Sequence, residues 1–452
     1  LGRIIGYNGG YMSLVKPRIP SGFPEYLPAE QLEFNRLVNI VRRVYEEYGF
    51  SPIDTPDLEL SEVLLTKSGG ETEQQIYRFI KGSNDLTMRF DLTVPLARYV
   101  AQHESELIFP FRRYHIGKVH RGERAQAGRF REFYQCDIDV IGSNSVAVDA
   151  EMPIVINKIF EQFDIGEFTV HINNRKILNG FFESLGLSNI SKDVLRIVDK
   201  IDKISANSFT EELEQLGLSA DQITRLREFI NINGSKDVIL NKLEKMSLDC
   251  KSDQFKQGVK EIGLVVKTIR DFGLSDSRFM IDLRIARGLD YYTGTVYETM
   301  LNNHPEIGSI CSGGRYDNLA NHYTKKYLPG VGVSIGLSRL FYKLCEIGAI
   351  KSTRFSSAEV VVMPIGSGQI TASVKIAERL RSTGINTMLY TEENNMRKKL
   401  KYADKMGFEW VVLIGEDELL TEEVMLKNML TGESIRIKSV ELDSFLLDKL
   451  KK

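Results

Sequence analysis

Two strand-like segments joined by an arginine-rich loop, between residues 111 and 142, constrain the fold of this chain more than any other feature. The first segment has a strand-like apolar pattern, and the second runs over residues 133–140. The loop carries Arg121, Arg124, Arg129 and Arg131. Because a guanidinium group is a rigid fork of donors that matches phosphate oxygens in pairs, this hairpin suits a polyanion held beside a sheet. A solvated hairpin with surface arginines is the alternative that this pattern alone leaves open.

The chain of 452 residues is too long for one compact core, so we expect about two to four domains. Its formal net charge of −2 gives no global attraction to nucleic acid or membrane, so any nucleic-acid surface must be local. No apolar run reaches the roughly 20 residues of a membrane helix. The cysteines are far apart and form no CxxC pair, which predicts neither disulfides nor a zinc site and favours a reducing, cytoplasmic location. They are Cys136, Cys250, Cys311 and Cys345.

The first eleven residues are glycine-rich and have no periodic pattern, whereas Met12 resembles a natural start. We therefore expect 1–11 to be a cloning remnant and exclude it from the fold.

The first part of the chain predicts a mixture of helices and short strands. Prolines at positions 52 and 56 restrict the strand near them to a sheet edge. Periodicity and turn residues predict helices over 28–48, 93–102 and 147–163, an edge strand over 51–56 and a hairpin over 77–91.

Composition changes near residue 173, where helical periodicity replaces the aromatic and arginine clusters up to about residue 272. We interpret this stretch as an inserted helical domain. Short strands and glycine turns return over 279–297 and 310–319, and the segment 330–337 runs into an apolar helix.

A polar linker over 351–357 precedes a small α/β domain. Its pattern predicts strands over 359–365, 385–390 and 409–414, helices over 371–381 and 395–406, and a hairpin over 424–437.

Polar residues at alternate positions mark two segments as candidate site walls. Asp91 and Thr93 alternate in one, and Gln135, Asp137 and Asp139 alternate in the other. If both segments are strands, Asp91 and Asp139 face one pocket floor from neighbouring strands. The alternative is that each belongs to a solvated strand face.

Two further segments, 287–294 and 311–317, combine an arginine, tyrosines and glycines. Tight turns and cross-strand packing are the plainer explanations of these residues. Other phosphate-binding patterns are missing: no GxxxxGK[ST] occurs, and the glycines of 330–336 have the wrong spacing for a dinucleotide loop. No HExxH motif is present. We interpret His115 and His120 as hydrogen-bonding strand residues.

Taken together, these motifs resemble the histidyl-tRNA synthetases, a class II aminoacyl-tRNA synthetase family, from residue 13 onward. Residues 111–142 look like motif 2 and residues 332–340 like motif 3. Residues 287–292 match the histidine-specific RGLDYY segment, and residues 313–317 match GGRYD. Pro56 fits the weaker pattern of motif 1, which forms the dimer in this family.

The resemblance implies an α+β catalytic domain on a mostly antiparallel sheet, with a helical insertion and a C-terminal α/β anticodon-binding domain. The implied boundaries are 12–172 and 274–350 for the two parts of the catalytic domain, 173–273 for the insertion, and 358–452 for the anticodon-binding domain. The implied reaction uses ATP and Mg²⁺ to convert L-histidine to histidyl-adenylate and pyrophosphate. The histidyl group then passes to tRNA(His), and AMP is released. The family also implies a homodimer.

The resemblance assigns residues to three substrates. Arg121 and Arg287 become the catalytic cations, and each also contacts histidine and ATP. Histidine is expected to meet Asp91, Leu92, Thr93, Gln135, Asp139, Tyr291, Tyr292 and Tyr316. ATP is expected to meet Glu123, Arg129, Phe133 and Arg339. The tRNA acceptor end is expected to meet Arg124 and Gln126.

Two details concern the branch of the family and the anticodon domain. Some members carry glutamate where this chain has Asp91 and Asp139, which resembles the eukaryotic-like branch, whereas Gln126 resembles bacterial members. The helix over 395–406 carries a basic run that a tRNA partner would explain and that otherwise is a solvated face. The run comprises Arg397, Lys398, Lys399, Lys401 and Lys405.

Two other functions compete with this prediction. Synthetase-like folds also serve as the regulatory subunit of ATP phosphoribosyltransferase and as sensor domains in a starvation-responsive kinase, so a non-catalytic, histidine-sensing paralogue is the alternative. The anticodon domain and the joint presence of Arg121, Arg287 and Arg339 favour the enzyme. A synthetase for proline or threonine is the second competitor, and RGLDYY argues against it.

Overall fold

The fold is described from a computed structural model, which covers residues 15–65, 75–124, 128–201, 204–285, 292–318 and 320–450. The chain divides into two compact units. In the described part, the first contains 15–24, 49–156 and 166–343, and the second contains 25–48, 157–165 and 344–450. Within the described residues, no helix has the length and apolar character needed to cross a membrane.

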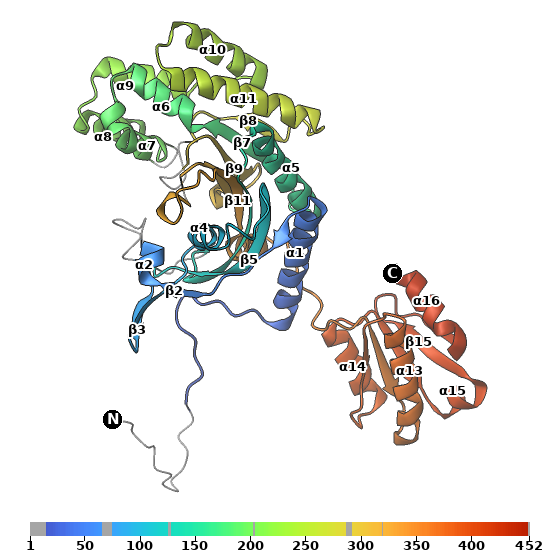
Figure 1. The fold of residues 1–452 in the computed structure, drawn as a ribbon. Coiled ribbons are helices and arrows are strands. Elements are labelled where there is room, and N and C mark those ends of the chain that lie inside the picture. The colour runs from blue at the N-terminus through green and yellow to red at the C-terminus, as the bar shows by residue number, and fades with distance from the viewer. Residues whose placement is uncertain are drawn as a thin grey trace. The chain divides into compact units, whose positions relative to one another are not determined.

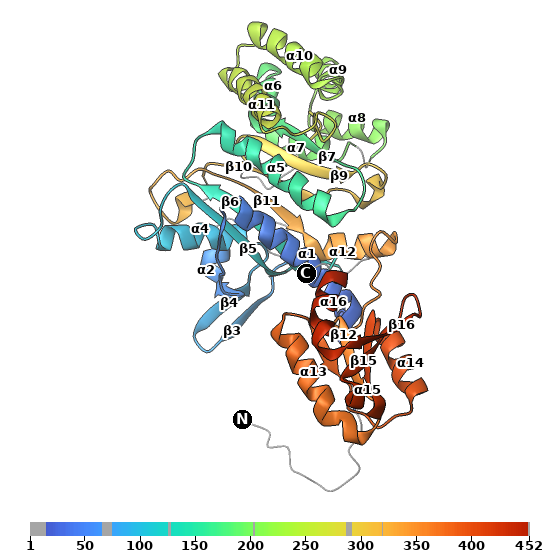
Figure 2. The same ribbon diagram turned by 90° about the vertical axis from the view of Figure 1, so that its right-hand side faces the viewer.

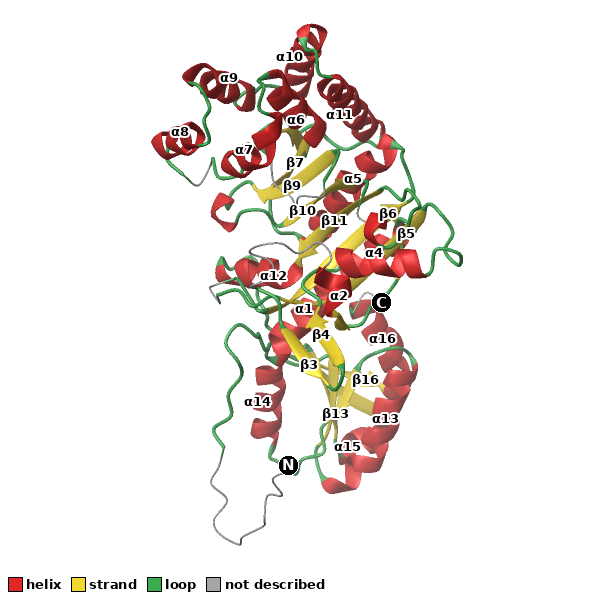
Figure 3. Cartoon of the chain, turned by 60° about the vertical axis from the view of Figure 1, so that its left-hand side comes forward, coloured by secondary structure: helices red, strands yellow, loops and turns green. Residues whose placement is uncertain are grey.

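The first unit is built on an eight-stranded sheet with the order β1-β5-β6-β11-β10-β9-β7-β8 (Figures 1 and 3). The pairs β1·β5 and β7·β8 are parallel and the other pairs are antiparallel, so the prediction of a mostly antiparallel sheet is confirmed. The strands are β1 (Ser51–Pro52), β5 (Phe111–His120), β6 (Glu132–Ile141), β7 (Phe168–Asn174), β8 (Phe279–Ile281), β9 (Thr295–Leu301), β10 (Cys311–Tyr316) and β11 (Gly330–Gly336).

The hairpin of β5 and β6 lies inside this sheet, as the alternation of residues 111–142 predicted, and β1 forms the predicted edge. The register places Asp137 of β6 opposite Ser334 of β11, Ser334 opposite Ser312 of β10, and Ser312 opposite Glu298 of β9. Because side chains alternate between faces, these four side chains lie on one face of the sheet, together with Gln135. A row of polar groups therefore crosses four neighbouring strands.

The predicted hairpin of residues 77–91 forms, but in a separate three-stranded sheet with the order β2-β4-β3. Its strands are β2 (Leu58–Leu60), β3 (Arg78–Lys81) and β4 (Asn84–Met88). The expectation that Asp91 and Thr93 share a strand beside Asp139 is wrong, because β4 ends at Met88 and α4 (Thr93–Gln102) begins at Thr93. Asp91 Oδ1 accepts from the Val94 backbone N–H at 3.1 Å, so the carboxylate satisfies a free donor at the start of the helix.

The predicted helical stretch forms six helices, which gather by the β7–β8 edge of the sheet (Figures 1 and 2). Serine side chains at positions 205, 219, 235 and 252 accept from backbone N–H groups at the starts of four of them. α6 and α11 cross closely at Gly258, where a Cβ would lie 2.7 Å from the Ile177 backbone nitrogen. The helices are α6 (Arg175–Ser184), α7 (Ser191–Val198), α8 (Ala206–Gln215), α9 (Ala220–Ile230), α10 (Lys236–Asp249) and α11 (Asp253–Asp271).

Four other helices complete this part of the chain: α1 (Pro28–Glu47), α2 (Ser61–Leu64), α5 (Val146–Phe163) and α12 (Leu337–Glu346). The predictions of α1, α4, α5 and α12 are confirmed. α5 is tied to the sheet through its first turn, where Asp149 binds Thr295 Oγ1 at 2.7 Å and Arg315 Nε at 3.0 Å.

The C-terminal domain has a five-stranded sheet with the order β13-β12-β14-β15-β16. One apolar cluster joins β12 and β14 to α13 and α16, and a second lies on the other face with α14. The strands are β12 (Val360–Pro364), β13 (Thr387–Leu389), β14 (Trp410–Ile414), β15 (Glu423–Asn428) and β16 (Ser434–Lys438), and the helices are α13 (Ile370–Ser382), α14 (Met396–Met406), α15 (Glu416–Thr421) and α16 (Leu442–Lys449). α15 and α16 were not predicted, although Leu442 and Leu446 are buried one helical turn apart.

Candidate functional site

A cavity of about 540 Å³ lies over the polar face of the eight-stranded sheet. Its walls come from β6, β9, β10 and β11, from the segment before α4, and from the start of α12. It brings together the predicted residues Asp91, Thr93, Arg121, Glu123, Arg129, Phe133, Gln135, Tyr292 and Arg339. Segments that are distant in the sequence thus meet around one space, as the sequence predicted.

Several predicted residues lie elsewhere. Leu92, Asp139 and Tyr316 are buried behind the cavity wall. Arg124 is exposed and does not line the cavity. Arg287, Tyr291 and Gln126 lie outside the described residues.

Cationic groups line part of the cavity wall. The Arg121 Nε donates to the Phe90 carbonyl at 3.0 Å, and its guanidinium lies 5.2 Å from the centre of the Phe133 ring. Arg339 donates to the Ile307 carbonyl at 2.8 Å. A backbone carbonyl therefore fixes the Arg121 guanidinium without neutralising its charge, which leaves it able to attract an anion.

Buried acidic groups lie next to the same cavity. Arg113, which is fully buried, forms an ion pair with Asp139 in which its Nη2 lies 2.5 Å from Oδ2. The Tyr316 hydroxyl donates to Asp139 Oδ1 at 2.6 Å. Burial raises the pKa of Asp139 to about 6 and the pKa of Asp137 to about 7, although Arg113 opposes both shifts. Burial also raises the pKa of Asp91.

Two buried acceptor atoms of the cavity residues have no hydrogen-bond partner among the described residues. They are Asp91 Oδ2 and Gln135 Oε1. The other end of the Gln135 amide is engaged, because Nε2 donates to Ser334 Oγ at 2.7 Å. Buried acceptors are normally satisfied, so these two atoms indicate a ligand that brings hydrogen-bond donors.

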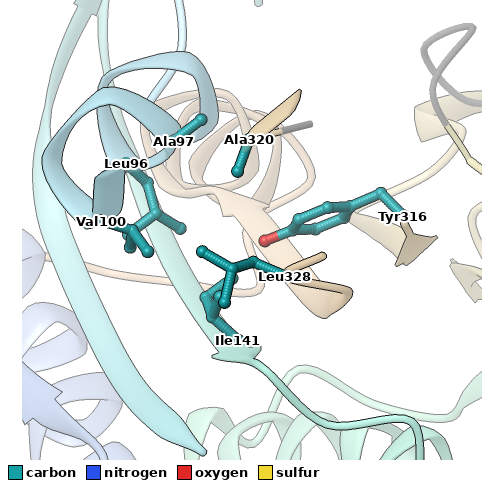
Figure 4. A pocket seen from close by; sticks show the side chains of 7 residues that line it. All are labelled: Leu96, Ala97, Val100, Ile141, Tyr316, Ala320 and Leu328. Atoms are coloured by element: carbon teal, nitrogen blue, oxygen red, sulfur yellow. The ribbon is translucent and has the colours of Figure 1, made fainter. Parts of the chain in front are cut away.

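A small apolar pocket holds the ring of Tyr316 (Figure 4). Its other lining residues are Leu96, Ala97, Val100, Ile141, Ala320 and Leu328. Among the described residues that line this pocket, the Tyr316 hydroxyl is the only polar side-chain group, and its hydrogen-bond partner is Asp139.

The comparisons with known proteins agree with this geometry. Residues 22–340 match the family described as histidyl-tRNA synthetase, and residues 359–449 match the anticodon binding domain. The chain is 54% identical to the histidine–tRNA ligase of Clostridium tetani over 93% of this chain and 95% of that protein. The chain belongs to the histidyl-tRNA synthetase family.

Other members support the same assignment. A histidine–tRNA ligase of Xanthomonas axonopodis pv. citri is 46% identical over 96% of each chain. The crystal structure of the histidyl-tRNA synthetase from Nostoc sp. PCC 7120 superposes with a TM-score of 0.91 at 41% identity and covers 96% of this chain and 100% of its own. The fold is therefore that of a class II synthetase.

Sequence reasoning missed several side chains of this histidyl-tRNA synthetase site. Glu298, Ser312 and Ser334 line the cavity, and Arg113 is the buried cation behind it. The two serines and Glu298 follow from strand register, which a single sequence does not reveal. Arg113 carried a local signal, since it lies in the apolar pattern of β5.

The two histidines predicted to be hydrogen-bonding strand residues have acidic neighbours. His120 Nε2 lies 3.1 Å from Glu132 Oε2, and His115 Nε2 lies 2.9 Å from Asp54 Oδ1. Among the described residues, no group of three or more histidine, cysteine or acidic side chains is arranged to hold a metal ion.

The predicted basic run on α14 is not one surface. Arg397, Lys398, Lys401 and Lys405 are exposed. Lys399 is 4% exposed, and its Nζ donates to the Pro364 carbonyl at 2.5 Å. Its inclusion among the tRNA-facing cations was wrong, because the helix turns this position toward the sheet.

Proposed function

We propose that this chain, as a histidine–tRNA ligase, carries out both of its reaction steps at the cavity. In the first step, the carboxylate of L-histidine attacks the α-phosphate of ATP, giving histidyl-adenylate and pyrophosphate. In the second, the 3′-terminal ribose of tRNA(His) takes the histidyl group, and AMP leaves. The observation that supports this proposal is one cavity that holds fixed guanidinium groups together with unsatisfied acceptors.

Arg121 is the proposed catalytic cation among the described residues. It lies beside Phe133 on the cavity wall, where it can neutralise the histidine carboxylate and the α-phosphate together. Because no covalent enzyme intermediate is needed, positioning and charge neutralisation supply the catalysis. Arg287 remains a predicted second cation.

The remaining ATP contacts follow from side-chain chemistry. The ring of Phe133 can stack on adenine, and Glu123 can accept from its amino group. Arg339 and Arg129 can bind the outer phosphates. The carboxylate of Glu298 lies in the same cavity and is a hard oxygen ligand of the kind Mg²⁺ prefers, so the site fits a Mg²⁺ ion that ATP brings. Such an ion supplies further neutralisation of phosphate charge.

Histidine is proposed to lie between Arg121 and Asp139. Asp91 and Gln135 offer acceptors, and Thr93 and Tyr292 complete the wall. The imidazole ring has two nitrogens and needs a polar partner at each end. The hydrogen-bonded pair of Asp139 and Tyr316 lies behind the cavity wall and can orient the side chain that contacts the imidazole ring. The Leu92 backbone carbonyl accepts from Arg113 at 3.5 Å.

The contacts with tRNA are less directly supported. Arg124, in the loop between β5 and β6, and Gln126 are proposed to meet the acceptor end. Arg397, Lys398 and Lys401 are proposed to meet the anticodon arm, because they are exposed on one helix of a domain that matches the anticodon-binding family.

The organisation of the molecule is proposed from the family. The boundaries are 12–172 and 274–350 for the catalytic domain, 173–273 for the insertion and 358–452 for the anticodon domain. Homodimerisation and a cytoplasmic location stay predictions.

The competing function, that of a regulatory paralogue, is supported only by a similarity of fold. A protein from Bacillus halodurans described as an ATP phosphoribosyltransferase regulatory subunit/histidyl-tRNA synthetase superposes with a TM-score of 0.72 at 20% identity. The presence of Arg121 and Arg339 in one cavity favours catalysis.

ATP–pyrophosphate exchange decides between the two functions. With the intact chain and no tRNA, exchange is expected with L-histidine and not with proline or threonine. Binding of histidine without exchange would instead establish the regulatory function. Aminoacylation of tRNA(His) then tests the second step.

A further inference from the structure

We infer that Arg131 is a positioning residue, which holds the loop between β5 and β6 in the shape that presents Glu123 to the adenine base. The inference rests on the proposed function, in which Glu123 accepts from the adenine amino group. The sequence places four arginines in this loop, and Arg131 is the one to which the family resemblance assigned no substrate.

Arg131 lies where the two described parts of the loop, residues 121–124 and 128–131, come together. β6 begins at Glu132, so Arg131 is the last loop residue before the strand. Its backbone carbonyl accepts from the Arg121 backbone N–H at 2.9 Å. Arg121 lines the cavity, whereas Arg131 does not. The guanidinium of Arg131 is therefore directed at other partners than a ligand in the cavity.

Those partners are backbone carbonyl groups. Arg131 Nε donates to the Glu123 carbonyl at 2.9 Å, and Nη1 donates to the Ser21 carbonyl at 3.5 Å. The first contact joins the two sides of the loop, and the second attaches them to the N-terminal segment. Because the guanidinium presents several donors in a fixed geometry, one side chain can hold both carbonyls in place.

Backbone groups of two other segments hold the same part of the loop. The Gly22 carbonyl accepts from the Arg131 N–H at 2.7 Å and from the Glu132 N–H at 3.4 Å. Gly22 has a φ of 86°, which glycine adopts without strain. On the other side of the loop, the Gly122 N–H donates to the Gln75 carbonyl at 2.6 Å. The Arg131 side chain thus completes an anchored frame.

Glu123 is the substrate-facing residue that depends most directly on this frame. It lines the cavity, and its Oε2 lies 3.8 Å from Arg129 Nη1. Since a side chain moves with the backbone that carries it, release of the Glu123 carbonyl would displace its carboxylate. Asp91 and Gln135, which are proposed to meet histidine, belong to other segments. Loss of Arg131 is therefore expected to affect recognition of the base and not of histidine.

The test is pyrophosphate exchange by the full chain with two nucleotides, ATP and inosine triphosphate, in which a carbonyl oxygen replaces the adenine amino group. The preference is the ratio of the two kcat/KM values at saturating L-histidine. Arg131→Met keeps an apolar stem but removes the donors. It should lower the preference for ATP by about 5- to 30-fold, because the hydrogen bond to the charged Glu123 is no longer aligned. The KM for L-histidine should change by less than about twofold, as expected for independent sites.

Arg131→Gln separates a hydrogen-bonding role from a role of the charge. The amide nitrogen of glutamine lies as many bonds from the backbone as the arginine Nε, so it can donate to the Glu123 carbonyl without a charge. This variant should restore most of the preference for ATP. If Arg131 acted as a cation on the phosphates, the glutamine variant would behave like Arg131→Met, and that outcome would overturn the inference.

Arg112→Met is the matched control. Arg112 is another half-buried arginine of the same hairpin, but its Nη2 donates to Glu151 Oε1 at 2.9 Å and it does not line the cavity. This variant measures the cost of losing a half-buried arginine from the hairpin and should leave the nucleotide preference unchanged.

Two results with Arg131→Met would overturn the inference: an unchanged nucleotide preference, or a loss of exchange that is equal for the two nucleotides, which would indicate a merely structural role. If this variant does not fold, Gly22→Ala takes its place. Alanine is strained at the φ of Gly22 and should displace the carbonyl that holds the Arg131 N–H. Gly22→Ala should then lower the preference for ATP, and an unchanged preference would again contradict the inference.

The wild-type chain distinguishes the inference from the function on which it rests. Equal use of ATP and inosine triphosphate would refute the contact between Glu123 and adenine, and with it the role of Arg131, while leaving the ligase function intact. Absence of exchange with either nucleotide would instead refute the proposed function.

Discussion

The two large sheets of this chain bury very different side chains. In the C-terminal domain, β12 and β14 are buried along their whole lengths, and apolar clusters cover both faces of the sheet. In the catalytic sheet, β6 and its neighbours bury Arg113, Asp137 and Asp139. Buried charges lower the stability of a fold unless they are paired, and in this part of the sheet Arg113 is surrounded by several carboxylates.

This difference separates the side chains that a sheet needs for folding from those that it needs for a functional site. The C-terminal sheet follows the local rule that parallel strands covered on both sides are continuously apolar. The catalytic sheet breaks the apolar pattern on the face that bounds the cavity. A local conflict between sequence and burial therefore locates the site.

The largest expected effect tests the buried cation. Arg113→Met should lower the free energy of unfolding by about 3–5 kcal/mol, because it leaves Asp139 buried without its partner. Chemical denaturation that follows the catalytic unit measures this. A change below about 1 kcal/mol, the range of exposed ion pairs, would mean that the pair does not hold this sheet together.

The matching change in the other sheet is Leu380→Ala, which removes a fully buried side chain from the C-terminal core. It should cost about 2–5 kcal/mol in that domain. ATP–pyrophosphate exchange should remain at the wild-type rate, since the cavity lies in the other unit. A loss of exchange in the folded variant would contradict the functional separation of the two sheets.

The second largest effect concerns rate. Arg121→Ala should lower histidine-dependent exchange by about 10²- to 10³-fold, the usual cost of one donor aimed at developing charge. Arg121→Lys keeps the charge but loses the fork, and should recover only part of the rate. Thermal unfolding should change little, because Arg121 is a half-buried cavity residue. An exchange rate within threefold of wild type, roughly 0.6 kcal/mol, would exclude the catalytic role.

A smaller effect is the pH dependence of stability. The folded pKa values of Asp137 and Asp139, about 7 and about 6, are raised above the value of about 3.9 for an unfolded aspartate. The folded state therefore holds these protons more tightly, and their contribution to stability declines as pH rises from about 4 to about 7. Asp137→Asn should flatten this decline, measured as the thermal midpoint from pH 4 to pH 8. If the thermal midpoint of the variant declines with pH as steeply as that of wild type, Asp137 is not a source of this pH dependence.

The smallest effect distinguishes two neighbouring lysines of α14. Lys401→Ala should weaken tRNA binding a few-fold and reduce the salt dependence of the affinity by about one unit of slope. Lys399→Ala should instead destabilise the domain, because it removes the buried hydrogen bond to Pro364. Filter binding at several salt concentrations, with thermal unfolding, separates the two. If Lys399→Ala weakened tRNA binding and Lys401→Ala destabilised the domain instead, the exposed side of α14 would not face tRNA.

The family resemblance supplied most of the predicted residues that line the cavity, whereas local pattern was enough for the hairpin of residues 111–142 and for most helices. It failed where two local rules compete: the alternation of Asp91 and Thr93 indicates a strand, but Pro95 and the carboxylate at position 91 favour a helix start, and the helix forms. It also failed for Ser334 and Glu298, whose roles depend on which strands become neighbours. Lys399 was misjudged because a run of like residues conceals that one of them faces inward.

One carboxylate in this site has two structural roles. Asp91 secures the beginning of α4 with one oxygen and leaves the other in the cavity. Substitutions at this position cannot adjust ligand recognition and helix initiation separately: alanine loses both, and asparagine keeps the acceptor for the helix but replaces the second acceptor with a donor. Position 91 is therefore expected to tolerate fewer residue types than either role alone would allow. Binding of a ligand in the cavity should also slow the hydrogen exchange of backbone amides in the first turn of α4.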